Sequence, residues 1–154
     1  MNNSYIINKN TLLIRTNINK TGIIILDDKK TIIIDNNLQK FINDSCKYYG
    51  NSYKGKLESS KLYLNKSIKL PIVINEISEL IIFPTSSIRN SNCIWIVYNN
   101  IDSIKKFDHN NTIIIFKNGI EICINCSYYI INNQISNCAR LKCLLIERKR
   151  AINM

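Results

Sequence analysis

The chain is poor in glycine, proline and histidine, with four, two and one of them among its 154 residues. The glycines are scattered singly, so the sequence lacks the glycine-rich loop that cradles phosphates in nucleotide-binding enzymes. The only histidine, His109, lies in "KKFDHNN", which is typical of a surface turn, and no local motif prepares a nucleophile beside it. Acidic residues are too dispersed to nominate a catalytic carboxylate pair. We therefore expect no enzyme.

Long apolar runs are also missing. No stretch approaches the roughly twenty apolar residues that span a bilayer, and the first apolar runs, "YII" and "TLLI", are too short and interrupted for a secretory signal. We expect a cytoplasmic protein whose six cysteines are mostly reduced thiols. We find no internal repeat, no Gly/Ser/Pro linker and no low-complexity tail, which indicates a single domain over residues 1–154.

Four of the cysteines superficially resemble a zinc site. Cys123 and Cys126 form a C-x2-C pair, and Cys138 and Cys143 follow. Zinc needs paired thiolates that converge on one side of a tight turn. The odd spacing of the first pair on or beside a strand points its side chains to opposite faces, and the second pair diverges on a predicted helix. We expect buried apolar thiols, with neither a metal nor a cofactor.

Positive charge is plentiful, because 21 Lys and Arg face 11 Asp and Glu, for a formal net charge of +10. Such an excess favours a phosphate-rich partner, since a polyanion that binds lysines releases counterions. The alternative is the codon bias of an A/T-rich genome, which enriches Ile, Asn, Lys and Tyr together. Composition alone leaves both interpretations open.

Short β-branched runs with polar breaks predict an α+β domain with a mostly antiparallel sheet. In the first third, strands are expected over "YII", "TLLIRT", "GIIIL" and "TIII". Further on, "LPIVI" and "ELIIFP" predict a hairpin, and "CIWIVY" another strand. The strongest hairpin signal is Asn118-Gly119 within "NTIIIFKNGIEICI".

Two segments have the helical period instead. A central helix is predicted over about 37–49, with Asn36 or Asn37 as its N-cap and Gly50 at its end. A C-terminal helix is predicted from about Ser127, and its last turns are basic.

Two polar segments are candidate contact surfaces for nucleic acid. If the central helix ends near Gly50, residues 51–56 form an exposed loop that donates to phosphates, as does the polar loop "TSSIRNSN" further on. The guanidinium of Arg89 in that second loop can enter a minor groove, whose floor offers mainly acceptors. The alternative is a helix cap followed by a solvated loop, and the residues alone leave the two balanced. The candidate DNA-binding residues are Lys47, Lys54 and Lys56 for phosphates, with Ser52, Tyr53 and Arg89 as further donors.

The two segments also resemble a known family. "DSCKYYGNSYKGK" and "LPIVINEISELIIFPTSSIRNSNCIWIVYNNI" are similar to the competence transcription factors of the ComK family. The shared residues are Ser45, Cys46, Lys47, Tyr48, Tyr49, Gly50, Ser52, Tyr53, Gly55 and Lys56, then Phe83, Pro84, Thr85, Ser87, Cys93 and Trp95. Weaker similarity continues through "FKNGIEICINCSYYIINNQISNCAR". The resemblance thus covers most of the chain, from about Tyr5 to Leu145.

The resemblance implies an activator of DNA-uptake genes that binds paired A-run and T-run boxes of double-stranded DNA through the minor groove, bends the DNA and acts as a homo-oligomer. It also implies RNA polymerase and a proteolytic adaptor as partners. In longer members the adaptor and assembly contacts involve a C-terminal extension, and this chain stops at "ERKRAINM", so those contacts are not expected here.

The loop between Thr85 and Cys93 lacks a proline often seen in the family and carries Arg89, so its DNA contacts are expected to differ. We assign Tyr49, Phe83 and Trp95 to core packing. The alternative function is a non-specific module for single-stranded DNA or RNA, with bases stacked on Tyr48 and Tyr53 over a basic surface.

Overall fold

The structure, a computed structural model, describes residues 5–153 and confirms the α+β class. The elements run β1 (Thr11–Thr16), β2 (Ile23–Asp27), β3 (Thr31–Ile34), α1 (Leu38–Tyr48), α2 (Tyr53–Leu64), β4 (Ile72–Asn75), β5 (Leu80–Pro84), β6 (Ile94–Val97), the 3-10 turn η1 (Tyr98–Asn100), β7 (Ile101–Lys106), β8 (Thr112–Phe116), β9 (Glu121–Ile124) and α3 (Tyr128–Ile152). Two sheets result, a six-stranded one in the order β3-β2-β1-β6-β5-β4 and a three-stranded one in the order β7-β8-β9. All pairs are antiparallel.

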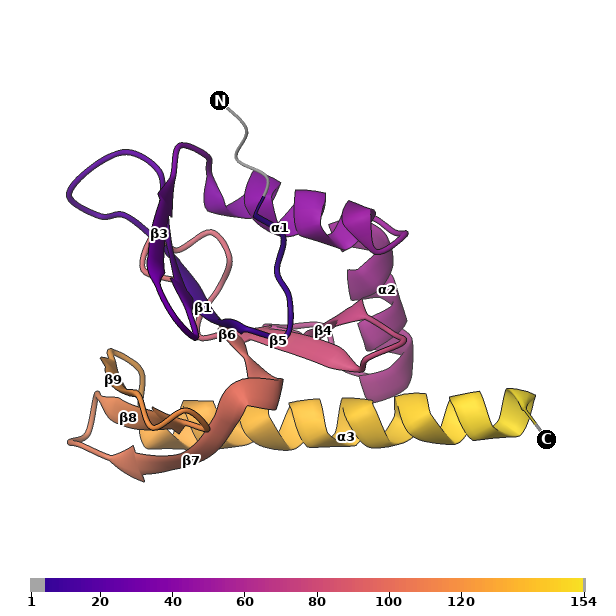
Figure 1. The fold of residues 1–154 in the computed structure, drawn as a ribbon. Helices are drawn as coiled ribbons and strands as arrows, with labels where there is room; N and C mark the ends of the chain where they lie inside the picture. The colour runs from indigo at the N-terminus through magenta and orange to yellow at the C-terminus, as the bar shows by residue number, and fades with distance from the viewer. Residues whose placement is uncertain (1–4, 154) are drawn as a thin grey trace.

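The large sheet lies between two layers (Figure 1). One face is covered by α1, and the other by α3 together with the small sheet. Helix α2 runs along the β4 edge of the sheet, from α1 to α3. Because both faces are covered, the inner strands β5 and β6 are buried along their whole length, which explains their unbroken apolar runs. None of the described helices is both long and apolar enough to cross a membrane.

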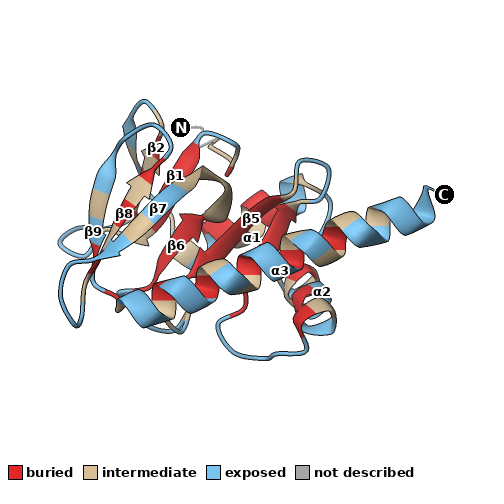
Figure 2. Cartoon of the chain, turned by 90° about the horizontal axis from the view of Figure 1, so that it is seen from below, coloured by how far each residue is buried: buried red, intermediate tan, exposed pale blue. Residues whose placement is uncertain are grey.

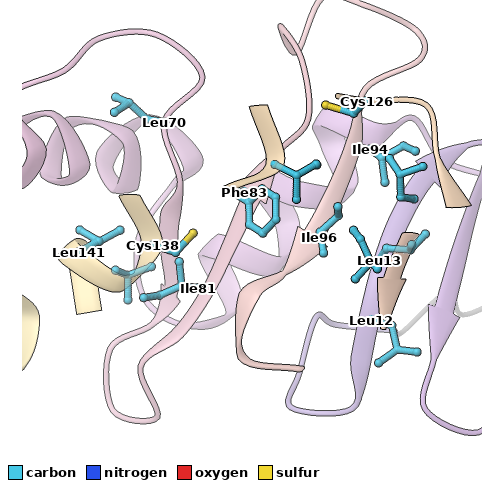
Figure 3. Packing of buried hydrophobic residues seen from close by; sticks show 14 of the residues in the cluster. Leu12, Leu13, Leu70, Ile81, Phe83, Ile94, Ile96, Cys126, Cys138 and Leu141 are labelled. Atoms are coloured by element: carbon cyan, nitrogen blue, oxygen red, sulfur yellow. The ribbon is translucent and has the colours of Figure 1, made fainter. Parts of the chain in front are cut away.

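Each face of the large sheet has its own core. On the α3 side, Phe83 and Ile96 from the sheet lie near Cys138 and Leu141 of α3 (Figure 3). On the α1 side, the residues buried together include Ile14, Trp95, Phe41, Ile42 and Cys46. Phe83 and Trp95 are 0% and 2% exposed, which confirms their assignment to core packing. Tyr49 is half-buried and donates its hydroxyl proton to the Ile7 carbonyl at 2.8 Å.

Both predicted helices are confirmed, and their caps explain their limits. The side chain of Asn37 accepts from the Lys40 N–H at 2.7 Å, and the side chain of Ser127 accepts from the N–H of the third helical residue in the same way. After α1, Gly50 has a φ of +106°, a conformation that glycine adopts without steric cost.

One expected strand is absent, and two elements lie where the sequence predicts no helix or strand. The segment Tyr5–Ile7 is irregular chain rather than strand, although Ile7 is fully buried and the Tyr5 hydroxyl donates to the Asp27 carboxylate at 2.7 Å. Strand β7 was not predicted, because its sequence "IDSIKK" has only two apolar residues and no alternation. Helix α2 was not predicted either, and it lies within the candidate contact surface. The two predicted hairpins and the exposed turn around His109 are confirmed.

The cysteines divide by burial. Cys46, Cys93, Cys126 and Cys138 are buried, whereas Cys123 and Cys143 are exposed. The members of each candidate zinc pair therefore do not share one environment. Over residues 5–153, no three His, Cys, Asp or Glu side chains are grouped so that they could hold a metal ion.

This division predicts the reactivity of the thiols. We expect a maleimide to modify Cys123 and Cys143 rapidly in the folded protein and the four buried thiols only after unfolding, because the thiolate is the reactive form. Burial raises the pKa of the Cys46 thiol to about 12 and also raises the pKa of Cys93 and Cys138, so little thiolate exists near neutral pH. Mass spectrometry of a labelling time course measures this. Rapid labelling of a third thiol would contradict the burial described here.

Candidate nucleic-acid interface

Residues 51–56 begin a helix and do not form the expected loop. Ser52 is the N-cap of α2, and its hydroxyl oxygen accepts from the Gly55 N–H at 3.1 Å. The N–H of Tyr53 donates to the side chain of Asn43 in α1 at 2.9 Å, so α1 itself supplies a second cap for α2. The chain thus turns from α1 through Gly50 directly into α2 (Figure 1). The loop prediction is wrong because the capping capacity of Ser52 outweighs the glycine that follows.

Two of the expected contact residues are partly or fully buried. Lys56 is only 7% exposed and lies close to the buried thiol of Cys46. Tyr53 is half-buried, and its ring meets that of Trp95 edge-on, with centroids 6.1 Å apart. Burial raises the pKa of Tyr53 to about 12. Both side chains therefore pack beneath the surface at the corner between α1 and α2.

A weak signal in the sequence could have located α2. Leu57, Ser60 and Leu64 recur at three- and four-residue spacing, and Ser60 and Leu64 are buried. Ser52 stands at the N-cap position before this series. The signal is weak because the inward face also contains a lysine and a serine instead of apolar residues.

Two of the expected cations remain accessible at this corner. Lys47 in the last turn of α1 and Lys54 in the first turn of α2 are both exposed. Neither makes an ion pair within residues 5–153. The first turn of α2 contains no acidic residue, so its unpaired N–H groups and Lys54 together present positive charge.

The second polar segment forms a closed loop between β5 and β6. Its base is fixed by the buried Thr85, whose N–H donates to the Ile94 carbonyl and whose hydroxyl oxygen accepts from the Ile94 N–H at 3.0 Å. Within the loop, the N–H of Asn90 donates to the Ser87 carbonyl. Arg89 is exposed, and its guanidinium has no hydrogen-bond or ion-pair partner among the described residues. Hydrogen bonds therefore fix the shape of the loop, and the loop exposes the guanidinium of Arg89.

Ile88 joins this loop to the α1–α2 corner. It lines a small apolar pocket together with Leu38, Ile42, Tyr53 and Trp95. The two segments that the sequence analysis identified thus meet around Tyr53, Ile88 and Trp95, although nearly thirty residues separate them in the chain. The structure brings the loop and the helical corner together on one side of the large sheet.

A polar cleft borders the other flank of the loop. It lies between the two sheets, and its lining includes Arg15 of β1, Asn92 of the loop and Asn125 after β9. No acidic side chain lines it. The sequence analysis missed these residues, and no local pattern marks them, because only the packing of one sheet against the other brings them together.

The model of the ComK protein family matches residues 2–150 of this chain. A curated relative, the competence transcription factor of Bacillus subtilis (strain 168), is 27% identical over 103 residues, a match that covers 67% of this chain and 54% of the relative. The match thus spans about half of the length of that relative. No solved structure shows a significant match to the chain. Because the family model extends over nearly the whole sequence, the protein belongs to the ComK family.

Proposed function

We propose that the protein is a DNA-binding transcriptional activator of competence genes and not an enzyme. Membership of the ComK family and the name of the B. subtilis relative support this function. The net charge of +10 suits a polyanionic partner. A DNA-binding activator of this kind would work in the cytoplasm, in contact with RNA polymerase. We do not include a proteolytic adaptor among the proposed partners.

The proposed binding mode is recognition of A/T-rich boxes through the minor groove of duplex DNA. Arg89 supports this binding mode most directly, because its side chain is exposed and has no ion-pair partner within the described chain. A/T tracts narrow the minor groove and concentrate its negative potential, which attracts an inserted arginine. The loop also presents Ser87, Asn90 and Asn92, whose side chains suit the acceptors on the groove floor.

Phosphate contacts are proposed on both flanks of the loop. Lys47 and Lys54 at the α1–α2 corner would contact the phosphates of one strand, and Arg15 with Asn125 in the polar cleft those of the other. Ser52, Tyr53 and Lys56 take supporting roles, since one caps α2 and the others are partly or fully buried. The proposed oligomer would place two such loops on paired boxes.

A competition experiment tests this function against the single-strand alternative. We expect fluorescence anisotropy to show tighter binding to an A/T-box duplex than to a scrambled duplex, and weaker binding to either single strand. Of the two tyrosines that the single-strand alternative uses for stacking, Tyr53 packs against Trp95, whereas Tyr48 is 69% exposed. Tighter binding to single strands would overturn the proposal.

The two kinds of contact predict different effects of mutation. Lys54→Ala should weaken binding to all sequences alike and reduce the slope of log K against log salt by about 0.9, because one phosphate contact is lost. Arg89→Ala should instead weaken binding mainly to the A/T-box duplex, by about tenfold, and so lower the preference over the scrambled duplex.

Lys66→Ala is the matched control, because Lys66 is an exposed lysine beyond the opposite end of α2. It removes the same charge and should leave the slope nearly unchanged. An equal effect of Lys54→Ala and Lys66→Ala would mean that net charge alone matters. A normal A/T preference in Arg89→Ala would exclude the loop from base recognition.

A further inference from the structure

The chain contains two similar structural units. In each, three antiparallel strands form a meander that leads into a helix, β1-β2-β3-α1 in one and β7-β8-β9-α3 in the other. Both first strands have an irregularity at the equivalent point, between Thr11 and Leu13 in β1 and between Ile101 and Ser103 in β7. Both second strands alternate buried and half-buried residues in the same order. Both third strands bury only their last residue.

The units differ in what lies beside their first strand. In the first unit, β1 pairs on its outer side with β6, so that Ile14 lies opposite Trp95. In the second unit, β7 pairs with β8 and has no strand on its outer side within residues 5–153. The same edge is thus occupied by an antiparallel strand in one unit and open in the other. Figure 2 shows β7 largely in the colour of exposed residues.

Main-chain groups of β7 are available at this edge. The N–H of Phe107 donates to the Asn111 carbonyl at 3.1 Å, which marks a hydrogen-bonded pair with β8. Hydrogen-bonded and non-hydrogen-bonded pairs alternate along an antiparallel ladder. Ile104, three residues earlier and opposite Ile114, therefore directs its N–H and carbonyl away from β8. Such unpaired groups can receive another strand.

A cleft adjoins this edge. It lies between β7 and α3, is open to solvent, has a volume of about 400 Å³, and is lined by Asp102 and Ile104 of β7 and Ile135 and Lys142 of α3, among others. Ile104 and Ile135 are half-buried and supply apolar contact. The helix thus flanks the edge without filling the space next to it.

The charges along β7 are self-complementary. A twofold axis relates identical strands, so an antiparallel pair centred on Ile104 places Asp102 of one copy opposite Lys106 of the second copy, and the reverse. Both side chains are exposed, and neither has an ion-pair partner in the described chain. Lysines and a strand irregularity are also devices that keep edges unpaired. The placement of Asp102 two residues before Ile104 and of Lys106 two residues after it favours pairing instead.

We propose that a second copy of this chain binds along the open edge of β7. The two three-stranded sheets then form one six-stranded antiparallel sheet, with both α3 helices on the same face. Two Ile104 residues meet on the axis, and each Asp102 pairs with Lys106 of the second copy across it. The inference deepens the oligomer named in the proposed function by giving its surface.

Charge reversal with rescue tests this surface. Sedimentation of the full chain without DNA should show a dimer for the wild type, and dimerisation weakened at least about tenfold for Asp102→Lys and for Lys106→Asp, because each brings like charges together twice. An equimolar mixture of the two variants should dimerise again, since one copy then has two lysines and the other two aspartates at these positions. The double variant should also dimerise.

The control is Lys20→Asp in the loop between β1 and β2, which makes the same charge change as Lys106→Asp but away from β7, and this variant should sediment as the wild type. A monomeric wild type at the highest soluble concentration overturns the proposal. So do single variants that dimerise normally, or a mixture that stays monomeric. These sedimentation experiments contain no DNA. A negative result would therefore contradict the dimer surface only, and the preference for A/T duplexes would still be tested by the competition experiment.

Discussion

Trp95→Ala is expected to lower the free energy of unfolding by about 3–5 kcal/mol, the range for truncating a large buried aromatic side chain. Trp95 is 2% exposed in β6, and its ring meets that of Tyr53 edge-on. Domains of this kind are stable by about 5–15 kcal/mol in total, so the variant should be largely unfolded at moderate urea. Urea titration followed by circular dichroism measures the loss.

Tyr53→Phe is the control for this prediction. It keeps the ring against Trp95 and removes only a hydroxyl, which makes no hydrogen bond to the described residues. The change in stability should stay below about 1 kcal/mol. If Trp95→Ala remained as stable as the wild type but lost DNA binding, Trp95 would be a contact residue and its assignment to the core would be wrong.

Gln134→Ala is expected to lower the free energy of unfolding by about 2–3 kcal/mol, because it leaves the buried Pro84 carbonyl and the partly buried Lys69 carbonyl without this donor. Gln134 lies on the buried face of α3 and is 4% exposed. Its amide nitrogen donates to the Pro84 carbonyl at 2.7 Å and to the Lys69 carbonyl at 2.8 Å. One side chain therefore ties α3 to the end of β5 and to the segment before β4. Thermal and urea unfolding measure the effect.

Two further variants separate hydrogen bonding from packing at this position. Asn133→Ala changes the exposed neighbour on the same helix and should alter stability by less than about 0.5 kcal/mol. Gln134→Leu fills a similar volume without a donor, so it should be nearly as unstable as Gln134→Ala. Full stability of Gln134→Leu would show that volume, and not the pair of hydrogen bonds, holds α3 in place.

Much of the fold could be predicted from local patterns. The helix around Phe41 has apolar residues at helical spacing, a side-chain cap and a glycine at its end, and all of these signals agree. The hairpin at Asn118-Gly119 follows from turn chemistry, which acts between near neighbours. The sequence did not predict β7, because this strand has only two apolar residues, or α2, because its inward face includes a lysine and a serine.

The candidate site was predicted only in part. Lys47, Lys54 and Arg89 are exposed as expected, since single lysines and arginines between polar neighbours are usually solvated. Lys56 belongs to the same basic segment and is buried, and nothing in that segment distinguishes it from Lys54. The difference arises because a helix turns residues two positions apart to different sides.

The sequence by itself determined the class of the fold, the positions of both predicted helices, the excess of positive charge and the two motifs of the family, all of which depend on composition or on residues near one another in the chain. Only the tertiary structure decided that half of those motif residues are buried beneath the surface. It also decided that Arg15 and Asn125 share a cleft with the Arg89 loop and that one of two similar units has an open edge. These features depend on how two sheets and three helices pack, and strand pairing over long separations leaves no local pattern in the residues that meet.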